Sequence, residues 1–371
     1  MLDHQLLAST PVFNAKRQAV VARLTVHPQP GFDAGALAAA LTEAWPDELG
    51  PLWLNVAGEA ALTALHATPL PAHVGLEVPT FMAADLPATA TPRLVKGQQL
   101  GRLTPEVLSR FGHALVDVGD APPALPWSLA GAQTVAEAHT AWQAGARHVV
   151  GWPLGDAPDG AVARKDIPAS VAVVMELMQL VDQDASGNQL EAVLRRDPAL
   201  AYRLLRYINS PGFGLSVEIT SFQHALMVLG YSRLKRWLAL LMTSAIDAPD
   251  LKPLLTLAVQ RGLLMEQMAR TSGDASLGGE LFICGVFSLL DRMLGQPFAT
   301  LLPKLPVPEA VAQALDGGNG PHRPWLDVAL AVEAGLPLDV RAGIDALMMA
   351  PTDLNAAVLA SLRGAWQMRV D

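Results

Sequence analysis

The sequence predicts an α+β protein of two domains, a shortened βα barrel at the N-terminus and an all-α domain at the C-terminus. Three observations support this prediction. The chain has 371 residues, more than the roughly 250–300 at which a single core tends to split. Up to about residue 155, short apolar or β-branched runs alternate with alanine-rich helical segments. From there to the C-terminus the apolar residues follow a helical period.

Alternation of this kind is typical of βα units around a largely parallel sheet. The expected strands are the runs at 11–13, 19–26, 52–56, 74–78, 93–95, 114–118, 128–130 and 148–152. Their number suits a TIM-like barrel, but several connections are short for full crossover helices. We therefore expect a shortened, degenerate barrel. The stretch at 153–160 is rich in Pro and Gly and breaks the pattern. We therefore expect domains at 1–160 and 161–371.

The helical half is most informative between Asp197 and Gly230. Asp197 is a good N-cap, and Pro198 suits the first helical position, where its missing N–H costs nothing. Asn209-Ser-Pro-Gly ends that helix, and Gly230 ends a second helix that begins near Ser221. These closely spaced helix start and stop signals predict a tight cluster of packed helices.

Composition limits the classes of function. Charged residues make up 16% of the chain, against about 25% in typical globular proteins, and the formal net charge is −9. Nucleic acid is therefore not an expected partner, since it calls for concentrated Lys and Arg. The single cysteine, Cys284, excludes an internal disulfide and favours a reducing cytoplasm. No apolar run approaches the ~20 residues needed to cross a bilayer, so we expect no membrane association.

The Asn-Ser-Pro turn at 209–211 and the Ala-Leu-x-x-Leu-Gly helix end at 225–230 resemble those of the HDOD domain of bacterial signalling proteins. The resemblance implies an all-α fold related to HD phosphohydrolases, whose adjacent His-Asp pair binds metal. The corresponding stretch here is 285–291, in which Ser288 and Leu289 take the two metal-binding places. Leucine cannot bind a cation, so we expect no metal in this domain.

The first 155 residues look like a shortened, degenerate EAL domain, the barrel that in active members hydrolyses cyclic-di-GMP with divalent metals. The resemblance rests on the opening segment 11–25 and on the later strand ends Leu54-Asn-Val and Leu76-Glu-Val-Pro. It places the glutamate that names the family at Arg23. It also leaves Asn55 and Glu77 where two metal ligands are expected.

Other positions of the EAL pattern are also changed. The resemblance puts the family's paired aspartates near Lys96 and Gly97, and its catalytic lysine near Asp117. Hydrolysis with metals needs several carboxylates that converge on hard cations. Arg23 would repel such a cation, and Asn55 and Glu77 alone cannot build a two-metal centre. We therefore expect no metal, no cofactor and no enzymatic activity.

A basic cluster lies in the helical half. Residues 195–236 contain seven basic side chains and two acidic ones. A solvated helix face and a contact surface for an acidic partner both fit this cluster. A helix-turn-helix for DNA is a further alternative, which apolar residues on more than one helix face disfavour. The residues assigned to a partner surface are Arg203, Arg206, Arg233, Lys235, Arg236 and Trp237.

Together these features predict a non-enzymatic signal-transduction protein of the bacterial cytoplasm. It would act through contacts with an unidentified signalling protein in cyclic-di-GMP-linked regulation, for example of motility or biofilm formation. The link to that messenger comes wholly from the resemblance. The alternatives are a residual cyclic-di-GMP phosphodiesterase with Asn55 and Glu77 as ligands, and a nucleotide sensor without turnover. The sequence predicts no particular oligomeric state.

Overall fold

The computed structural model describes residues 2–87, 91–154, 169–194, 196–197, 209, 219, 222–244, 251–270 and 275–368. The chain divides into two compact units. The first comprises Met1–Asp159 together with Leu330–Ala360, and the second comprises Gly160–Ala329 together with Ser361–Asp371. The first unit contains a barrel and the second is helical in its described residues, which confirms the predicted α+β class.

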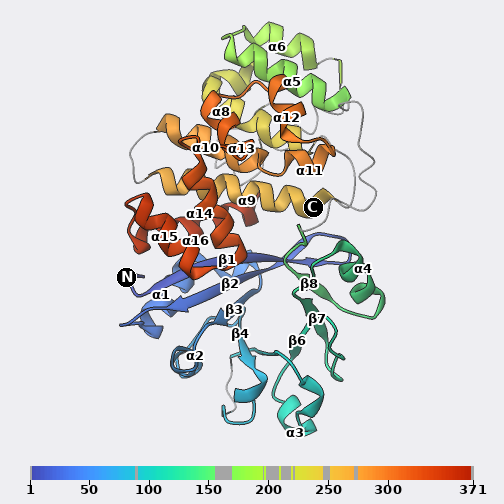
Figure 1. The fold of residues 1–371 in the computed structure, drawn as a ribbon, viewed down its shortest axis with the longest axis vertical. Coiled ribbons are helices and arrows are strands. Elements are labelled where there is room, and N and C mark those ends of the chain that lie inside the picture. The colour runs from blue at the N-terminus through green and yellow to red at the C-terminus, as the bar shows by residue number, and fades with distance from the viewer. Residues whose placement is uncertain are drawn as a thin grey trace. The chain divides into compact units, whose positions relative to one another are not determined.

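The barrel is closed, and its strands follow one another in chain order (Figure 1). Strand β1 is antiparallel to both β2 and β8, and all other neighbours are parallel. Each expected run forms a strand, although β1 begins well before its expected start. The strands are β1 (Gln5–Asn14), β2 (Ala19–Pro28), β3 (Leu52–Val56), β4 (Val74–Pro79), β5 (Arg93–Lys96), β6 (His113–Asp117), β7 (Trp127–Ala130) and β8 (His148–Val150).

The connections between strands are short, as expected for a shortened, degenerate barrel. Between β4 and β5 the described residues form only the 3₁₀ turn η2 (Thr80–Met82). The best-defined helix start is that of α4, where Thr134 and Glu137 form a capping box. Besides η2, the described connecting elements are α1 (Ala34–Ala44), η1 (Asp47–Leu49), α2 (Glu59–His66), η3 (Leu100–Arg102), α3 (Pro105–Leu108) and α4 (Val135–Gln143).

The barrel unit also includes residues 330–360, whereas the sequence analysis assigned everything after 160 to the helical domain. These residues comprise the end of α14 (Arg323–Ala334), all of α15 (Pro337–Ala346) and the first part of α16 (Pro351–Gln367). The chain passes from the first unit to the second near residue 160, and the C-terminal segment belongs partly to each unit. No local pattern in the sequence distinguishes these helices from the others.

The side chain of Asn355 on α16 connects this segment to the barrel through hydrogen bonds. Its buried side-chain Nδ2 donates to the carbonyl oxygens of Leu2 and Gln5, at 2.8 Å each. Its Oδ1 accepts from the backbone N–H of Leu7 at 2.9 Å. Strand β8 pairs only with Val12–Asn14 of β1, so the earlier part of that edge lacks a strand neighbour there. The asparagine amide pairs with this edge as a neighbouring strand would.

The first described helix of the helical unit is α5 (Ala169–Asp182), and the described helices pack mainly through apolar faces. Helix α8 is interrupted at Gly230, whose φ of 70° and ψ of 172° are not helical, as the sequence predicted. The predicted helix after Asp197 lies outside the described residues. The helices are α5 (Ala169–Asp182), α6 (Gly187–Leu194), α8 (Phe222–Ser244), α9 (Lys252–Ala269), α10 (Ala275–Phe287), α11 (Leu290–Leu294), α12 (Phe298–Leu301), the 3₁₀ turn η7 (Leu302–Lys304) and α13 (Glu309–Leu315).

Helices α9 and α10 approach each other closely at two glycines. A Cβ atom added at Gly285 would lie 2.6 Å from the Cα and backbone N of Gly262. Real Cβ atoms do not approach backbone this closely, so one helix would have to move. A hydrogen atom in place of a side chain at Gly285 is therefore a condition of this packing.

We predict that Gly285→Ala destabilises the helical unit, by about 1–3 kcal/mol, because the added methyl overpacks the crossing of α9 and α10. The free energy of unfolding in urea measures this. Gly279→Ala is the matched control, since nothing lies within 4 Å of a Cβ atom added there on the same helix. The control should keep or raise stability because alanine favours helix. Equal effects of the two substitutions would contradict the close-packing interpretation.

We predict that Asn355→Ala destabilises the barrel unit by about 2–4 kcal/mol, because backbone groups at Leu2, Gln5 and Leu7 lose their partner. Thermal unfolding followed by circular dichroism provides the measurement. Gln367→Ala removes an exposed amide from the same helix and should change the stability by less than about 0.5 kcal/mol. An Asn355→Ala protein as stable as this control would show that the edge of β1 does not need the amide.

Candidate functional site

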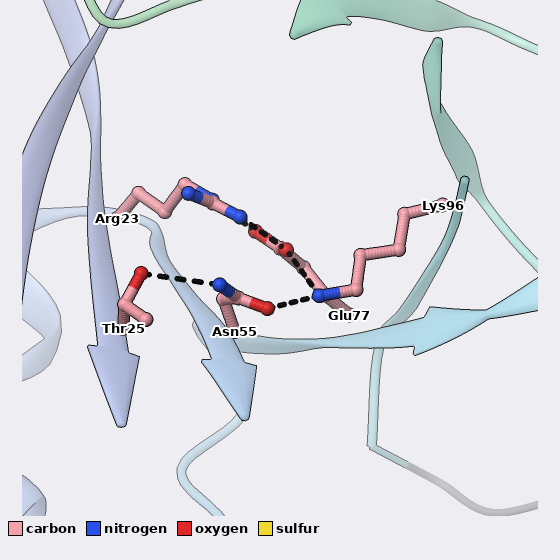
Figure 2. A network of polar contacts seen from close by, with 5 residues as sticks. All are labelled: Arg23, Thr25, Asn55, Glu77 and Lys96. Carbon is pink, nitrogen blue, oxygen red and sulfur yellow. Dashed lines mark hydrogen bonds and ion pairs between the residues drawn. The ribbon is translucent and has the colours of Figure 1, made fainter. Parts of the chain in front are cut away.

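The polar residues singled out by the sequence meet inside the barrel. Arg23 on β2, Asn55 on β3 and Glu77 on β4 point toward one another, and Lys96 at the end of β5 joins them (Figure 2). Asn55, Glu77 and Lys96 lie in the last two or three residues of their parallel strands. The carboxyl-terminal ends of barrel strands are where active sites of this architecture are built. The polar network therefore lies at the end of the barrel where active-site residues are expected in this architecture.

Glu77 is the centre of the network, and its carboxylate has no exposure to solvent. Arg23 donates from Nε to Oε1 at 2.6 Å and from Nη2 to Oε2 at 2.8 Å, which is a bidentate ion pair. The ammonium group of Lys96 lies 3.4 Å from Oε2 and also donates to the Oδ1 of Asn55. Asn55 in turn donates from Nδ2 to the hydroxyl of Thr25 at 3.2 Å.

The electrostatics follow from this geometry. Burial alone would raise the pKa of Glu77, but the charges and hydrogen bonds of Arg23 and Lys96 outweigh it and lower that pKa below its ordinary value. Burial lowers the pKa of Lys96, partly opposed by Glu77. At the end of β6, burial and the neighbouring Asp120 raise the pKa of Asp117. The carboxylate at the centre is thus ionised and neutralised by side chains.

A divalent metal does not fit this arrangement. Both oxygens of Glu77 face cationic groups, and a metal ion would have to displace Arg23 and Lys96 while lying beside them. In the part of the chain that the structure describes, no group of three or more His, Cys, Asp or Glu side chains could hold a metal ion. The sequence predicted the repulsion by Arg23. It missed that Lys96 would bind the same carboxylate, although the position of Lys96 at a strand end was a signal.

The second position compared with a metal site lies at the junction of α10 and α11. Ser288 donates from Oγ to the carbonyl of Gly285 at 2.6 Å and accepts from Nη1 of Arg261 at 3.0 Å. The side chain of Leu289 is buried. Asp291 lies nearby, and burial raises the pKa of its carboxyl group. Serine, leucine and a single carboxyl group here form a packed junction, with an arginine where a metal would need anionic ligands.

The predicted partner surface requires correction. Trp237 is 0% exposed and belongs to the core, so it cannot contribute to a surface. Lys235 pairs with Asp182 of α5 at 2.5 Å. Arg236 pairs with Glu266 of α9, and its guanidinium lies 4.1 Å from the centre of the Phe282 ring.

The local charge count left out two carboxylates that come from other helices and pair with Lys235 and Arg236. Asp182 and Glu266 are distant in sequence from the basic cluster and were not counted with it. Arg233 is exposed on α8. Arg203 and Arg206 lie outside the described residues. Within the described ranges, no helix is both long and apolar enough to cross a membrane.

Comparison with known proteins identifies part of the helical unit. Residues 167–300 match the family model of the HDOD domain. The match covers none of the barrel strands, so the resemblance of the first 155 residues to EAL domains stays a prediction.

Two curated proteins are similar over part of the chain. Cyclic di-GMP phosphodiesterase CdgJ from Vibrio cholerae serotype O1 is 32% identical over 157 residues, which cover 42% of this chain and 36% of that protein. The uncharacterized protein YuxH from Bacillus subtilis (strain 168) is 27% identical over 161 residues, or 43% of this chain and 39% of YuxH. This chain therefore spans little more than a third of each relative.

Among solved structures, the PaMucR phosphodiesterase in complex with c-di-GMP covers 41% of this chain and 96% of its own. The sequence identity is 14% and the TM-score is 0.29, a likeness too low to support any inference.

We predict that Glu77→Gln destabilises the barrel by about 3–5 kcal/mol, because Arg23 and Lys96 would be left without their counter-ion in the interior. Denaturant unfolding near pH 7 measures the change. The matched control is Glu176→Gln, which breaks the exposed pair with Arg196 and should cost at most about 1 kcal/mol. The difference in free energy of unfolding between wild type and Glu77→Gln should disappear as the pH falls through the lowered pKa of Glu77. Protonation then removes the same charge from the wild-type side chain. A small effect of Glu77→Gln would contradict the view that this carboxylate is held by its charge.

Proposed function

We propose that this chain is a non-enzymatic signal-transduction protein of the bacterial cytoplasm that acts in cyclic-di-GMP-linked regulation. The HDOD match and the phosphodiesterase name of the CdgJ relative support the link to this messenger. In this proposal the barrel is an EAL-like domain that keeps its fold and has lost its metal centre. The helical unit carries the contacts to a partner protein.

The observation that carries the proposal is the bidentate pairing of Glu77 with Arg23. A hydrolase of this kind must present free carboxylates to metal ions that activate a water molecule. Here Glu77 is occupied by two side chains, of which Arg23 is 18% and Lys96 is 21% exposed. The same pairing argues against the residual phosphodiesterase, since that alternative needs Glu77 as a ligand.

The partner surface that the described residues favour is narrower than the sequence suggested. Met227 is 78% exposed on α8, and Arg233 is exposed on the same helix after the break at Gly230. An exposed apolar side chain and a cation on one element are typical of a contact with a protein that carries acidic groups. We therefore place the contact to an acidic signalling protein on this helix.

We predict that the purified chain does not hydrolyse cyclic-di-GMP with Mg²⁺ or Mn²⁺. We also predict that the double substitution Arg23→Glu with Lys96→Asp creates a Mn²⁺ site, because it replaces the two cations around Glu77 with carboxylates. Isothermal titration calorimetry with MnCl₂ measures binding, and chromatography of the nucleotide products measures hydrolysis. The matched control, Lys16→Asp with Arg102→Glu, makes the same change of charge at exposed positions and should not bind Mn²⁺ tightly.

Turnover by wild type that Glu77→Gln abolishes would overturn the non-enzymatic proposal. Binding of cyclic-di-GMP to wild type without turnover would instead favour the nucleotide sensor. Equal Mn²⁺ affinity of the two double variants would show that Arg23 and Lys96 do not block a metal site.

A further inference from the structure

A second polar cluster lies at the opposite ends of the strands from Glu77. His113 is the first residue of β6, His148 is the first residue of β8, and Ser128 lies on β7 between them. The Oγ of Ser128 is 2.7 Å from Nε2 of His113 and 3.1 Å from Nδ1 of His148. The two imidazole centres are 5.9 Å apart. One buried hydroxyl thus connects two imidazoles across three neighbouring strands.

The surroundings of this cluster are largely apolar. The indole of Trp53 on β3 lies 5.3 Å from the His113 ring and 5.8 Å from the His148 ring, centre to centre. Ser128 has no exposure to solvent. The charged group that acts on both imidazoles is Arg147, which precedes β8 and repels positive charge on either ring. The described neighbours therefore supply no carboxylate that would compensate a protonated imidazole.

The hydrogen bonds of Ser128 to both rings can be satisfied only while at least one ring is neutral. A serine hydroxyl has one hydrogen, so it donates to one imidazole and accepts from the other. When both rings are protonated, both nitrogens donate toward Oγ and the hydroxyl hydrogen has no acceptor among them. Two cations then lie 5.9 Å apart beside Arg147. The unsatisfied hydroxyl hydrogen and the repulsion between the cations both destabilise the doubly protonated cluster.

Strand β8 is the weakest point of the barrel closure. It has three residues, and it pairs with β7 through only Ser128↔His148 and Leu129↔Val149. On its other side it pairs with Val12, Phe13 and Asn14 of β1. The side-chain bond between Ser128 and His148 therefore adds to the short ladder between β7 and β8, next to the pairing of β8 with β1.

We propose that His113, Ser128 and His148 form an acid-sensitive latch, and that protonation of the two imidazoles releases β8 and opens the barrel between β7 and β1. The device is independent of the proposed function, since it needs only the geometry of the barrel. It gives the fold a local opening that responds to a fall in pH while the remaining strands stay paired.

The direction of the pH dependence follows from the same surroundings. Burial, with repulsion from His148 and Arg147, lowers the pKa of His113 to about 4, and burial with Arg147 lowers that of His148. In the open state both return toward the ordinary value of about 6.5. The open state then binds more protons between these values. The latch is therefore fully closed above about pH 6.5 and weakens as the pH falls toward 4.

Hydrogen exchange measured by mass spectrometry tests the latch in the full chain. Between pH 6.5 and 4.5, the protection factor of amides in 148–150 should fall by roughly tenfold per pH unit for each proton taken up. Amides in 52–56 should keep their protection. In His113→Gln with His148→Asn, the side-chain amides keep a polar atom toward Ser128 but do not titrate, so the protection of β8 should become independent of pH.

His27→Gln is the matched control, because burial lowers the pKa of His27 as well but it lies outside the latch. It should leave the behaviour of β8 unchanged. Should the double variant fail to fold, each single variant should show roughly half the wild-type slope on a logarithmic scale. An unchanged protection factor of β8 in wild type between pH 6.5 and 4.5 would overturn the proposal. An equal loss of protection at 52–56 would overturn it too, since that is global unfolding.

Discussion

A carboxylate without access to water has to be neutralised within the protein, and the interior of the barrel is arranged around this requirement at Glu77. Lys96 reaches it from the neighbouring strand β5 and Arg23 from β2, and Asn55 on the intervening strand β3 accepts a hydrogen bond from the lysine. Four consecutive strands are thereby joined through one charge. The ion pairs of this carboxylate with Arg23 and Lys96 therefore act as a structural cross-link between strands.

Much of the fold could be predicted because the signals are local. Apolar runs of strand length separated by turns identified each strand, and Gly230 marked a helix break through its backbone conformation. The position of residues 330–360 could not be predicted in this way. The hydrogen bonds that connect this segment to β1 are made by Asn355, whose partners are about 350 residues away in the sequence. An asparagine in a helix carries no local sign that its amide will pair with a strand edge.

The candidate site was predictable only in part. Alternation along the strands places Arg23, Asn55 and Glu77 on the inner face, so their proximity follows from the barrel. The role of Lys96 and the meeting of His113 with His148 needed the register between strands, which the sequence does not contain. On the helices, counting charges along 195–236 gave a basic surface, but two of its cations, Lys235 and Arg236, pair with carboxylates outside that range. The charge of a surface depends on all residues that are close in space, including those that are far apart in the sequence.

The pairing of Asn355 with β1 also has a consequence for the order of biosynthesis. The barrel strands are all translated once Val150 is made, yet Asn355 follows about two hundred residues later. At about 5–20 residues per second this is an interval of roughly 10–40 s. During that time the first strand on the nascent chain has an open edge at Gln5 and Leu7, which is a template for pairing with other chains. A ribosome-associated chaperone that covers this edge would therefore matter most while the helical unit is still being synthesised.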